Sequence, residues 1–243
     1  MITISKLRAA CRTTEIDAVS DRLVIEFDKG DWSSDTTLTS IFADLKIASD
    51  KITAAINRIK AESILEEKDE QRDNIIKSIN YLVFGFVHHP DTAISNAAKA
   101  VSGVFDNYGL RIIGESYATE SSLIESLLLD FENADLLPSI GAIPGLTELI
   151  ANLRTAQTEF EEAKVEFESE KAKEGNQVTA SEIKVDILDI INNRLIVYLR
   201  AMVMVNEAVY GSFSQTIAQI IDDMNMIVKK RIKSNSTDDE GTN

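Results

Sequence analysis

The sequence predicts an all-α protein, and three observations support that prediction. Only 10 of the 243 residues are glycine and 3 are proline, which is few for the turns of a many-stranded sheet. Hydrophobic residues make up 44% and charged residues 27%, so the chain can bury a substantial core. Apolar residues recur three and four positions apart, the spacing that places them on one face of a helix. We expect an elongated bundle of seven or eight helices in a single domain, 1–234.

The most regular helical pattern occurs twice. Residues 38–55 read LTSIFADLKIASDKITAA and residues 146–163 read LTELIANLRTAQTEFEEA. Aligned without a gap, they share Leu, Thr and Ala at the first, second and sixth positions and Leu, Ala and Ala further along. An apolar helix follows each copy, so we predict two similar three-helix halves, about 35–109 and 146–233, joined by a crossover at 110–145. The alternative, that any two amphipathic helices can be aligned in phase, stays open.

Small residues alternate with large ones on the apolar stripe of both copies. The alanines let a neighbouring helix approach closely, whereas the large residues supply most of the buried area. These alanines are Ala48, Ala55, Ala156 and Ala163.

Four helices are predicted in the first half of the chain: 16–27, 35–61, 75–87 and 90–108. Thr14 is the expected cap of the first, which stops near Gly30, and Gly109 suits the end of the fourth. The charged stretch 66–73 is expected to be a turn between the second and third helices.

The second half begins after an irregular middle. Ser122 and Glu125 have capping-box spacing for a Leu-rich helix, and the apolar connection 136–145, with two prolines and two glycines, should be ordered and packed. The second copy is expected to end at a turn near 174–177. The last two helices are expected to begin at Ser181 and, after a break at Gly211, at Ser212. Residues 235–243 should form a disordered acidic tail.

The charge of the chain argues against several partners. A formal net charge of −15 repels phosphate backbones, so we expect no nucleic-acid partner. The basic stretch 229–233 should complement the dipole of the last helix where that helix ends. No run approaches the roughly 20 apolar residues of a spanning helix. With one cysteine, Cys11, near an expected frayed end, and no signal-peptide pattern, we expect a cytoplasmic protein without intrachain disulfides.

A search for catalytic motifs finds none, so we predict no enzyme, no catalytic, cofactor-binding or metal-binding residues, and no cofactor. Glycine-rich phosphate-binding motifs and the nucleophile elbow do not occur. His88 and His89 are adjacent and diverge on a helix by about 100°, and neither has a glutamate three residues before it, as a two-metal carboxylate site requires. The acidic run 159–170 is expected to be a solvated helix face.

Three charged residues leave two interpretations open. Asp69, Arg72 and Asp73 can meet on one helix face, either as a recognition patch or as a surface pair worth under about 1 kcal/mol. We expect the surface pair. Trp32, in a turn between helices, is expected to cover one end of the bundle.

Several local signatures resemble a known family. They are the entry 69–73 into an apolar helix, the helix ending Tyr108-Gly109, the segment 115–117 before a Leu-rich helix, and the closing helix through Met224 and Asn225. The chain resembles, over about 7–233, bacterial all-helical proteins of about 240 residues that are catalogued as a domain of unknown function. The resemblance implies an all-α fold and no functional residues.

The function that the sequence favours is therefore non-enzymatic. The abundance of apolar helical face indicates an interaction or scaffolding protein that binds an unknown protein partner or self-associates. Two alternatives stay open. The apolar stretches 195–205 and 81–87 suggest a membrane-active, pore-forming type of protein, although we expect no membrane partner. A small-ligand-binding bundle would have its pocket under the 136–145 crossover.

Overall fold

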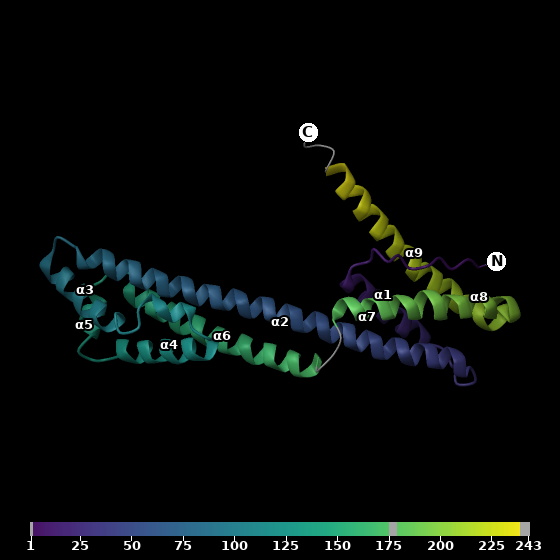
Figure 1. The fold of residues 1–243 in the computed structure, drawn as a ribbon, viewed down its shortest axis with the longest axis horizontal. Helices are drawn as coiled ribbons and strands as arrows, with labels where there is room; N and C mark the ends of the chain where they lie inside the picture. Colours follow the sequence, from purple (N-terminus) through teal and green to yellow (C-terminus); the bar gives the residue numbers. More distant parts are fainter. Residues whose placement is uncertain (1, 175–178, 239–243) are drawn as a thin grey trace. The chain divides into compact units, whose positions relative to one another are not determined.

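The computed structural model describes residues 2–174 and 179–238, and its elements are helical (Figure 1). No strand occurs among the residues it describes, so the predicted all-α class is confirmed. The helices are α1 (Thr13–Phe27), α2 (Thr36–Val87), α3 (Thr92–Phe105), α4 (Tyr117–Phe131), α5 (Leu137–Gly141), α6 (Leu146–Glu174), α7 (Ala180–Asp189), α8 (Ile196–Val205) and α9 (Glu207–Asp238). A 3₁₀ turn, Leu110–Gly114, precedes α4, and a π-helical segment, Ile190–Leu195, joins α7 to α8.

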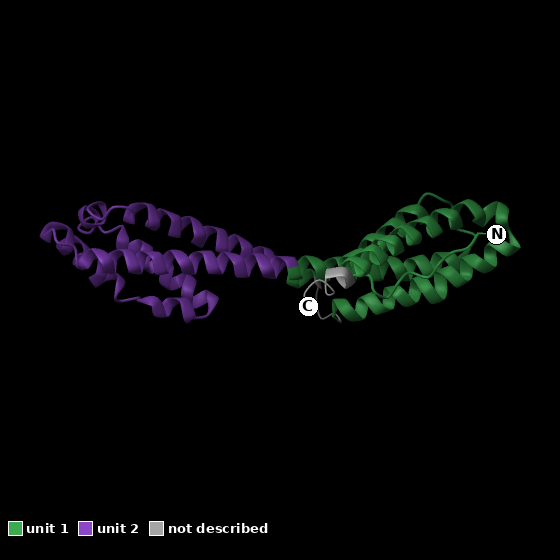
Figure 2. Ribbon diagram, turned by 90° about the horizontal axis from the view of Figure 1, so that it is seen from above, with its two compact units in different colours: residues 1–59, 170–243 green, residues 60–169 purple. Residues whose placement is uncertain are grey.

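The chain forms two compact units, coloured separately in Figure 2. Unit 1 comprises residues 1–59 and 170–243, and unit 2 comprises residues 60–169. The structure therefore differs from the predicted single domain 1–234, and the units do not coincide with the predicted halves 35–109 and 146–233. The two copies of the repeated helix lie in different units: the first packs with α1, α7, α8 and α9, and the second packs with the later part of α2 and with α3, α4 and α5.

Unit 1 has its own hydrophobic core. α1, the first part of α2, α7, α8 and α9 surround it, and α9 packs against both α1 and α8. The first copy of the repeat lies in this core with the predicted stripe inward. Its fully buried members are Leu38, Leu45, Ile52 and Ala55.

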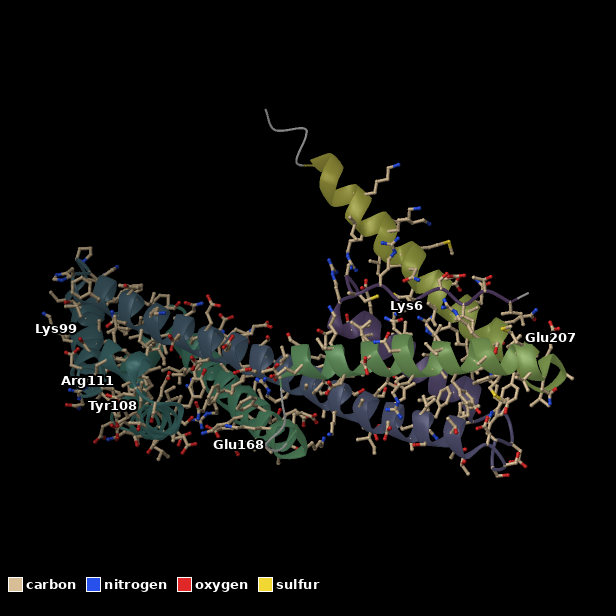
Figure 3. The ribbon with its side chains drawn as sticks, turned by 45° about the vertical axis from the view of Figure 1, so that its right-hand side comes forward. Lys6, Lys99, Tyr108, Arg111, Glu168 and Glu207 are labelled. Atoms are coloured by element: carbon tan, nitrogen blue, oxygen red, sulfur yellow. The ribbon has the colours of Figure 1, made fainter. Side chains whose placement is uncertain are left out.

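An extended N-terminal segment is bound along unit 1 by asparagine side chains. Asn192 accepts from the backbone N–H of Leu7 at 2.7 Å and donates to its carbonyl at 2.9 Å. Asn225 of α9 donates to the carbonyl of Lys6 at 2.9 Å, and Lys6 lies beside α9 in Figure 3. The segment also buries Cys11, so the expectation of a frayed end at Cys11 was wrong. These paired bonds satisfy backbone groups that no helix or sheet serves.

Unit 2 packs the second part of α2 with α3, α4, α5 and α6 around a second core. The segment 136–145 is ordered, as predicted, because Leu136, Ile140 and Ile143 are buried there. Gly145 has φ = 84°, a backbone conformation that favours glycine, immediately before α6. The crossover is therefore part of the core of unit 2.

The charged stretch 66–73 is helical and not the expected turn. α2 runs without interruption for 52 residues through it. Asp69 and Arg72 have partners inside unit 2, as described below, and Glu66, Glu67 and Glu70 are exposed on the helix, so no turn is needed to solvate the stretch. The expected boundary between two helices at this point was wrong.

Several expected helix ends also lie elsewhere. α4 begins after Ser116 and α7 after Thr179, whose hydroxyls accept from Thr119 N and Glu182 N, in place of Ser122 and Ser181. The break before α9 falls at Asn206 and not at Gly211. Of the expected tail 235–243, the chain is helical to Asp238 and the rest lies outside the described residues, as does the expected turn at 175–177.

The apolar stretch 195–205 is explained by the core of unit 1. Leu195, Ile196, Leu199 and Val203 are buried in it, and they account for one face of α8 and its entry. No helix in the described part of the chain is long and apolar enough to cross a membrane.

The buried alanines of the repeated helix give a stability prediction. Ala156 is buried on α6, whereas Ala151 on the same helix is exposed. Ala156→Leu should overpack the site and lower the free energy of unfolding by about 1–3 kcal/mol. Ala151→Leu should change it by less than about 0.5 kcal/mol. Urea denaturation of both variants measures this, and equal midpoints would show that Ala156 does not face a packed neighbour.

Candidate functional site

A fully buried arginine lies in unit 2. The side chain of Arg72 on α2 has 0% exposure, and its Nη2 donates to Asp69 Oδ1 and to Glu120 Oε2, at 2.9 Å in each case. Asp69 is one helical turn before Arg72, and Glu120 comes from α4. The expectation that Asp69, Arg72 and Asp73 form a surface pair was therefore wrong for the arginine. Its second partner, Glu120, is distant in sequence, and no local sequence pattern indicates it.

Polar and aromatic groups satisfy the other side of the guanidinium. Arg72 Nη1 donates to Ser121 Oγ on α4 and to Gln157 Oε1 on α6, at 3.0 Å in each case. The ring of Phe160 lies 3.7 Å from the guanidinium carbon, a cation–π contact. Ser121 donates in turn to Glu161, which also accepts from Gln157 at 3.2 Å. Three helices therefore converge on one cation.

We call this cluster the charged centre: it comprises Asp69, Arg72, Asp73, Glu120, Ser121 and Gln157. Helical periodicity explains its geometry, since positions 69, 72 and 73 on α2 and positions 157, 160 and 161 on α6 share one face of each helix. Glu120, Ser121 and Gln157 were not predicted as site residues from the sequence. The only local signal was a polar residue, Gln157, beside the alanine of an otherwise apolar stripe.

Three carboxylates of the charged centre lie close together. One oxygen from each of Asp69, Asp73 and Glu120 lies within 4.8 Å of the others. Burial raises the pKa of Glu120 to about 7; the Arg72 cation opposes this rise, whereas the charges of Asp69 and Asp73, and a hydrogen bond that protonated Glu120 can make with the Asp73 carboxyl, add to it. Burial also raises the pKa of Asp69, against the effect of Arg72. Three acidic groups thus surround one arginine, and the raised pKa values of Glu120 and Asp69 favour protonation of these two carboxyls.

Three buried atoms of the charged centre have no hydrogen-bond partner among the described residues. They are Arg72 Nε, Asp73 Oδ1 and Glu120 Oε1. Nearly all buried polar atoms in proteins are paired, so each exception calls for an explanation. Two of the three are carboxylate oxygens. Two ionised carboxylates cannot hydrogen-bond to each other, so either a proton or a cation must lie between them to satisfy both.

The other residues singled out from the sequence lie apart from the charged centre. His88 is exposed with its ring against Phe84, and His89 stacks on Phe86 and accepts from the backbone N–H of Asp91. Trp32 packs on Tyr210 and Phe213 in unit 1, as expected for a residue that covers the end of helices. These contacts are structural.

Two further charged segments differ from expectation. Within the acidic run 159–170, Glu161 bonds inside unit 2 and Glu170 is buried, so the run is not uniformly solvated. The basic stretch 229–233 does not end α9, which continues to Asp238, and Arg231 bonds to Glu15 and to the carbonyl of Ala10. The dipole of a helix end therefore does not explain this stretch.

A surface groove in unit 1 is the second candidate site. We define the groove as two cavities between α2 and the α7–α8 segment, with volumes of about 530 and 520 Å³. Arg194 of the π-helical segment lines both, and its Nη2 reaches Asp44 Oδ2 of α2 at 2.7 Å. Ile47, Val185 and Val197 line the groove although 56%, 63% and 53% of their surfaces are exposed. π-helical turns are often found at functional sites.

The burial of Arg72 gives a prediction about stability. Arg72→Met should lower the free energy of unfolding by about 3–5 kcal/mol, because it leaves the buried carboxylate of Glu120 without its partner. The matched control is Arg154→Met, which removes an exposed ion pair with Glu132 and should cost about 0–1 kcal/mol. Urea denaturation compares them. Adding Glu120→Gln to Arg72→Met should recover part of the loss; equal, small losses for both single variants would show that the charged centre is hydrated.

Comparison with known proteins places the chain in a family without assigning an activity. No curated protein and no solved structure matches the chain. A family model described as a family of unknown function, DUF6261, matches residues 62–225, which include the whole charged centre and most of the helices. This match begins later than the resemblance expected from the sequence, 7–233, and it covers more than half of the chain. The chain belongs to this family of unknown function.

Proposed function

We propose that this is a non-enzymatic helical protein of the cytoplasm that self-associates, with the groove of unit 1 receiving the C-terminal part of α9 from a second copy. The observation that carries the proposal is the groove. It exposes Ile47, Val185 and Val197 beside two cavities, and contiguous exposed apolar surface of this kind marks binding sites in soluble proteins. A groove between two helices suits another helix, which inserts apolar side chains three and four residues apart.

Charge complementarity selects the occupant. Arg194 is paired with Asp44, and the other charged residues that line this part of the groove are two acidic ones, Asp186 and Asp189, and one basic one, Lys51. A helix that carries apolar and basic side chains together would match this part of the groove.

The chain itself supplies such a helix. In the C-terminal part of α9, Met226 and Ile227 are each 52% exposed, and Lys229 and Lys230 beside them are exposed as well. The segment is basic in a chain whose net charge is −15. Within one chain α9 packs on α1 and α8, whereas the groove is lined by α2, α7, the π-helical segment and the start of α8. Reciprocal exchange between two copies would give a closed two-fold dimer.

The charged centre supports the non-enzymatic part of the proposal. Arg72 and Glu120 are 0% and 1% exposed, so a substrate has no access to the groups that would act on it. A buried thiol at Cys11, with a pKa raised by burial, is equally unsuited to nucleophilic work. A lone buried thiol is also the form that a reducing cytoplasm preserves.

Sedimentation of the full-length chain over a concentration series tests the proposal. The wild-type protein should reach the mass of two chains, and Val185→Glu in the groove should weaken the dimer at least about tenfold, since it places a charge against apolar side chains. Val165→Glu is the matched control, because Val165 is equally exposed on α6 of unit 2, and it should leave the dimer unchanged.

A charge exchange identifies the occupant. Lys230→Glu should weaken the dimer by opposing Asp186, and Asp186→Lys combined with it should restore the affinity. A wild-type protein that is monomeric throughout contradicts the proposal. So does a dimer that responds to Val165→Glu and not to Val185→Glu.

A further inference from the structure

Three carboxylates of the charged centre in unit 2 bring their oxygen atoms close together. Asp69 and Asp73 lie one turn apart on α2, Glu120 faces them from α4, and one oxygen of each lies within 4.8 Å of the other two. Ligands 2.0–2.5 Å from one cation are separated by about 3–5 Å, so this spacing fits a single ion. The sequence-based expectation was that the chain has no metal site.

Burial of an unpaired oxygen supplies the independent observation. Glu120 is 1% exposed, and Arg72 holds only its Oε2 at 2.9 Å. Its other oxygen, Oε1, has no hydrogen-bond partner in the described part of the chain, and neither does the buried Oδ1 of Asp73. An unpaired buried carboxylate oxygen is costly, so a positive group between these atoms would remove a large penalty.

The nearby cations do not provide that group. Arg72 Nη2 is shared between Asp69 and Glu120, on the other oxygen of the glutamate. Lys77 approaches only Oδ2 of Asp73, at 3.6 Å, and its side chain is 38% exposed. Three carboxylates therefore meet one buried and one half-exposed positive charge.

We propose that Asp69, Asp73 and Glu120 bind one divalent cation of the Mg²⁺ type, in a site that joins α2 to α4. The donor set is entirely carboxylate oxygen, which suits Mg²⁺ and Mn²⁺ and not the metals that prefer sulfur or imidazole. Three protein oxygens leave positions for water, as Mg²⁺ requires. Arg72 is the positioning residue, because its Nη2 holds one oxygen of Asp69 and one oxygen of Glu120 in place.

The site has a route for the ion and a consequence for stability. The side chains of Asp69 and Arg72 differ in exposure, at 26% and 0%, so the cation enters past the aspartates and not past the arginine.

An ion that binds only the folded chain raises the stability of that chain in proportion to the logarithm of the ion concentration. The site lies in unit 2 and is independent of the groove in unit 1, so its test is separate from that of self-association.

The experiment uses full-length protein freed of metal with a chelator. Addition of Mn²⁺, followed by the loss of the free-ion electron paramagnetic resonance signal, should show one ion per chain, and Mg²⁺ should compete for it. Saturating Mg²⁺ should raise the thermal midpoint, whereas the same ionic strength of K⁺ should not.

Two glutamate variants separate specific binding from general acidity. Glu120→Gln keeps the shape of the side chain and offers an N–H to Asp73, so the metal-free variant should be folded and at least as stable as the metal-free wild type. It should lose at least about tenfold in Mn²⁺ affinity and lose the Mg²⁺-dependent rise in midpoint. Glu132→Gln, at an exposed ion pair, should behave as the wild type.

Two outcomes would overturn the proposal. The first is no Mn²⁺ binding, with a stability that depends on pH and not on the cation, because the two unpaired oxygens then share a proton. The second is Mn²⁺ binding that Glu120→Gln leaves unchanged, because the ion is then held by the acidic surface of the chain.

Discussion

The structure of unit 2 depends on the burial of one guanidinium. An arginine cannot lose its proton at any pH that the fold survives, so its charge must be compensated wherever it is placed. α2, α4 and α6 each contribute to that compensation through Asp69, Glu120 and Gln157. A shift of one residue along any of these helices would turn its polar side chain away by about 100°. Arg72 therefore restricts the register of three helices, which apolar packing alone would leave less well defined.

The fold was predictable from the sequence wherever burial alone decides the structure. The stripe of 38–55, the ordered segment 136–145 and the start of α6 at Leu146 follow from helical periodicity and from the positions of proline and glycine. The helix ends were less predictable. Serine with a polar residue three positions later recurs at 122 and 212, one to two turns inside helices that begin after Ser116 and Asn206. A capping box shows only that a helix could begin, and packing selects which of several candidates is used.

The charged centre could not be predicted because its partners are distant in sequence. Ser121 and Gln157 lie 49 and 85 positions from Arg72, and no local pattern connects them. Charged residues normally face water, so the stretch 66–73 was interpreted as an exposed turn. The burial of Arg72 reversed that interpretation, since a paired charge can lie inside a continuous helix. Only its spacing from Asp69 was visible beforehand, and that pair alone could not distinguish a surface ion pair from a buried one.

The two candidate sites contain groups that destabilise the folded chain. Apolar side chains in water and carboxylate oxygens without partners both raise the free energy of the folded state. Favourable packing elsewhere in the structure offsets this increase. In each case a ligand of the right chemistry would remove the cost: an apolar, basic helix in the groove, and a divalent cation at Glu120. Packing could have avoided both features by ordinary substitutions, for example a polar residue at Val185 or an amide at position 120. Neither substitution is present, although both units are otherwise well packed. This is the physical reason why we propose binding at these positions.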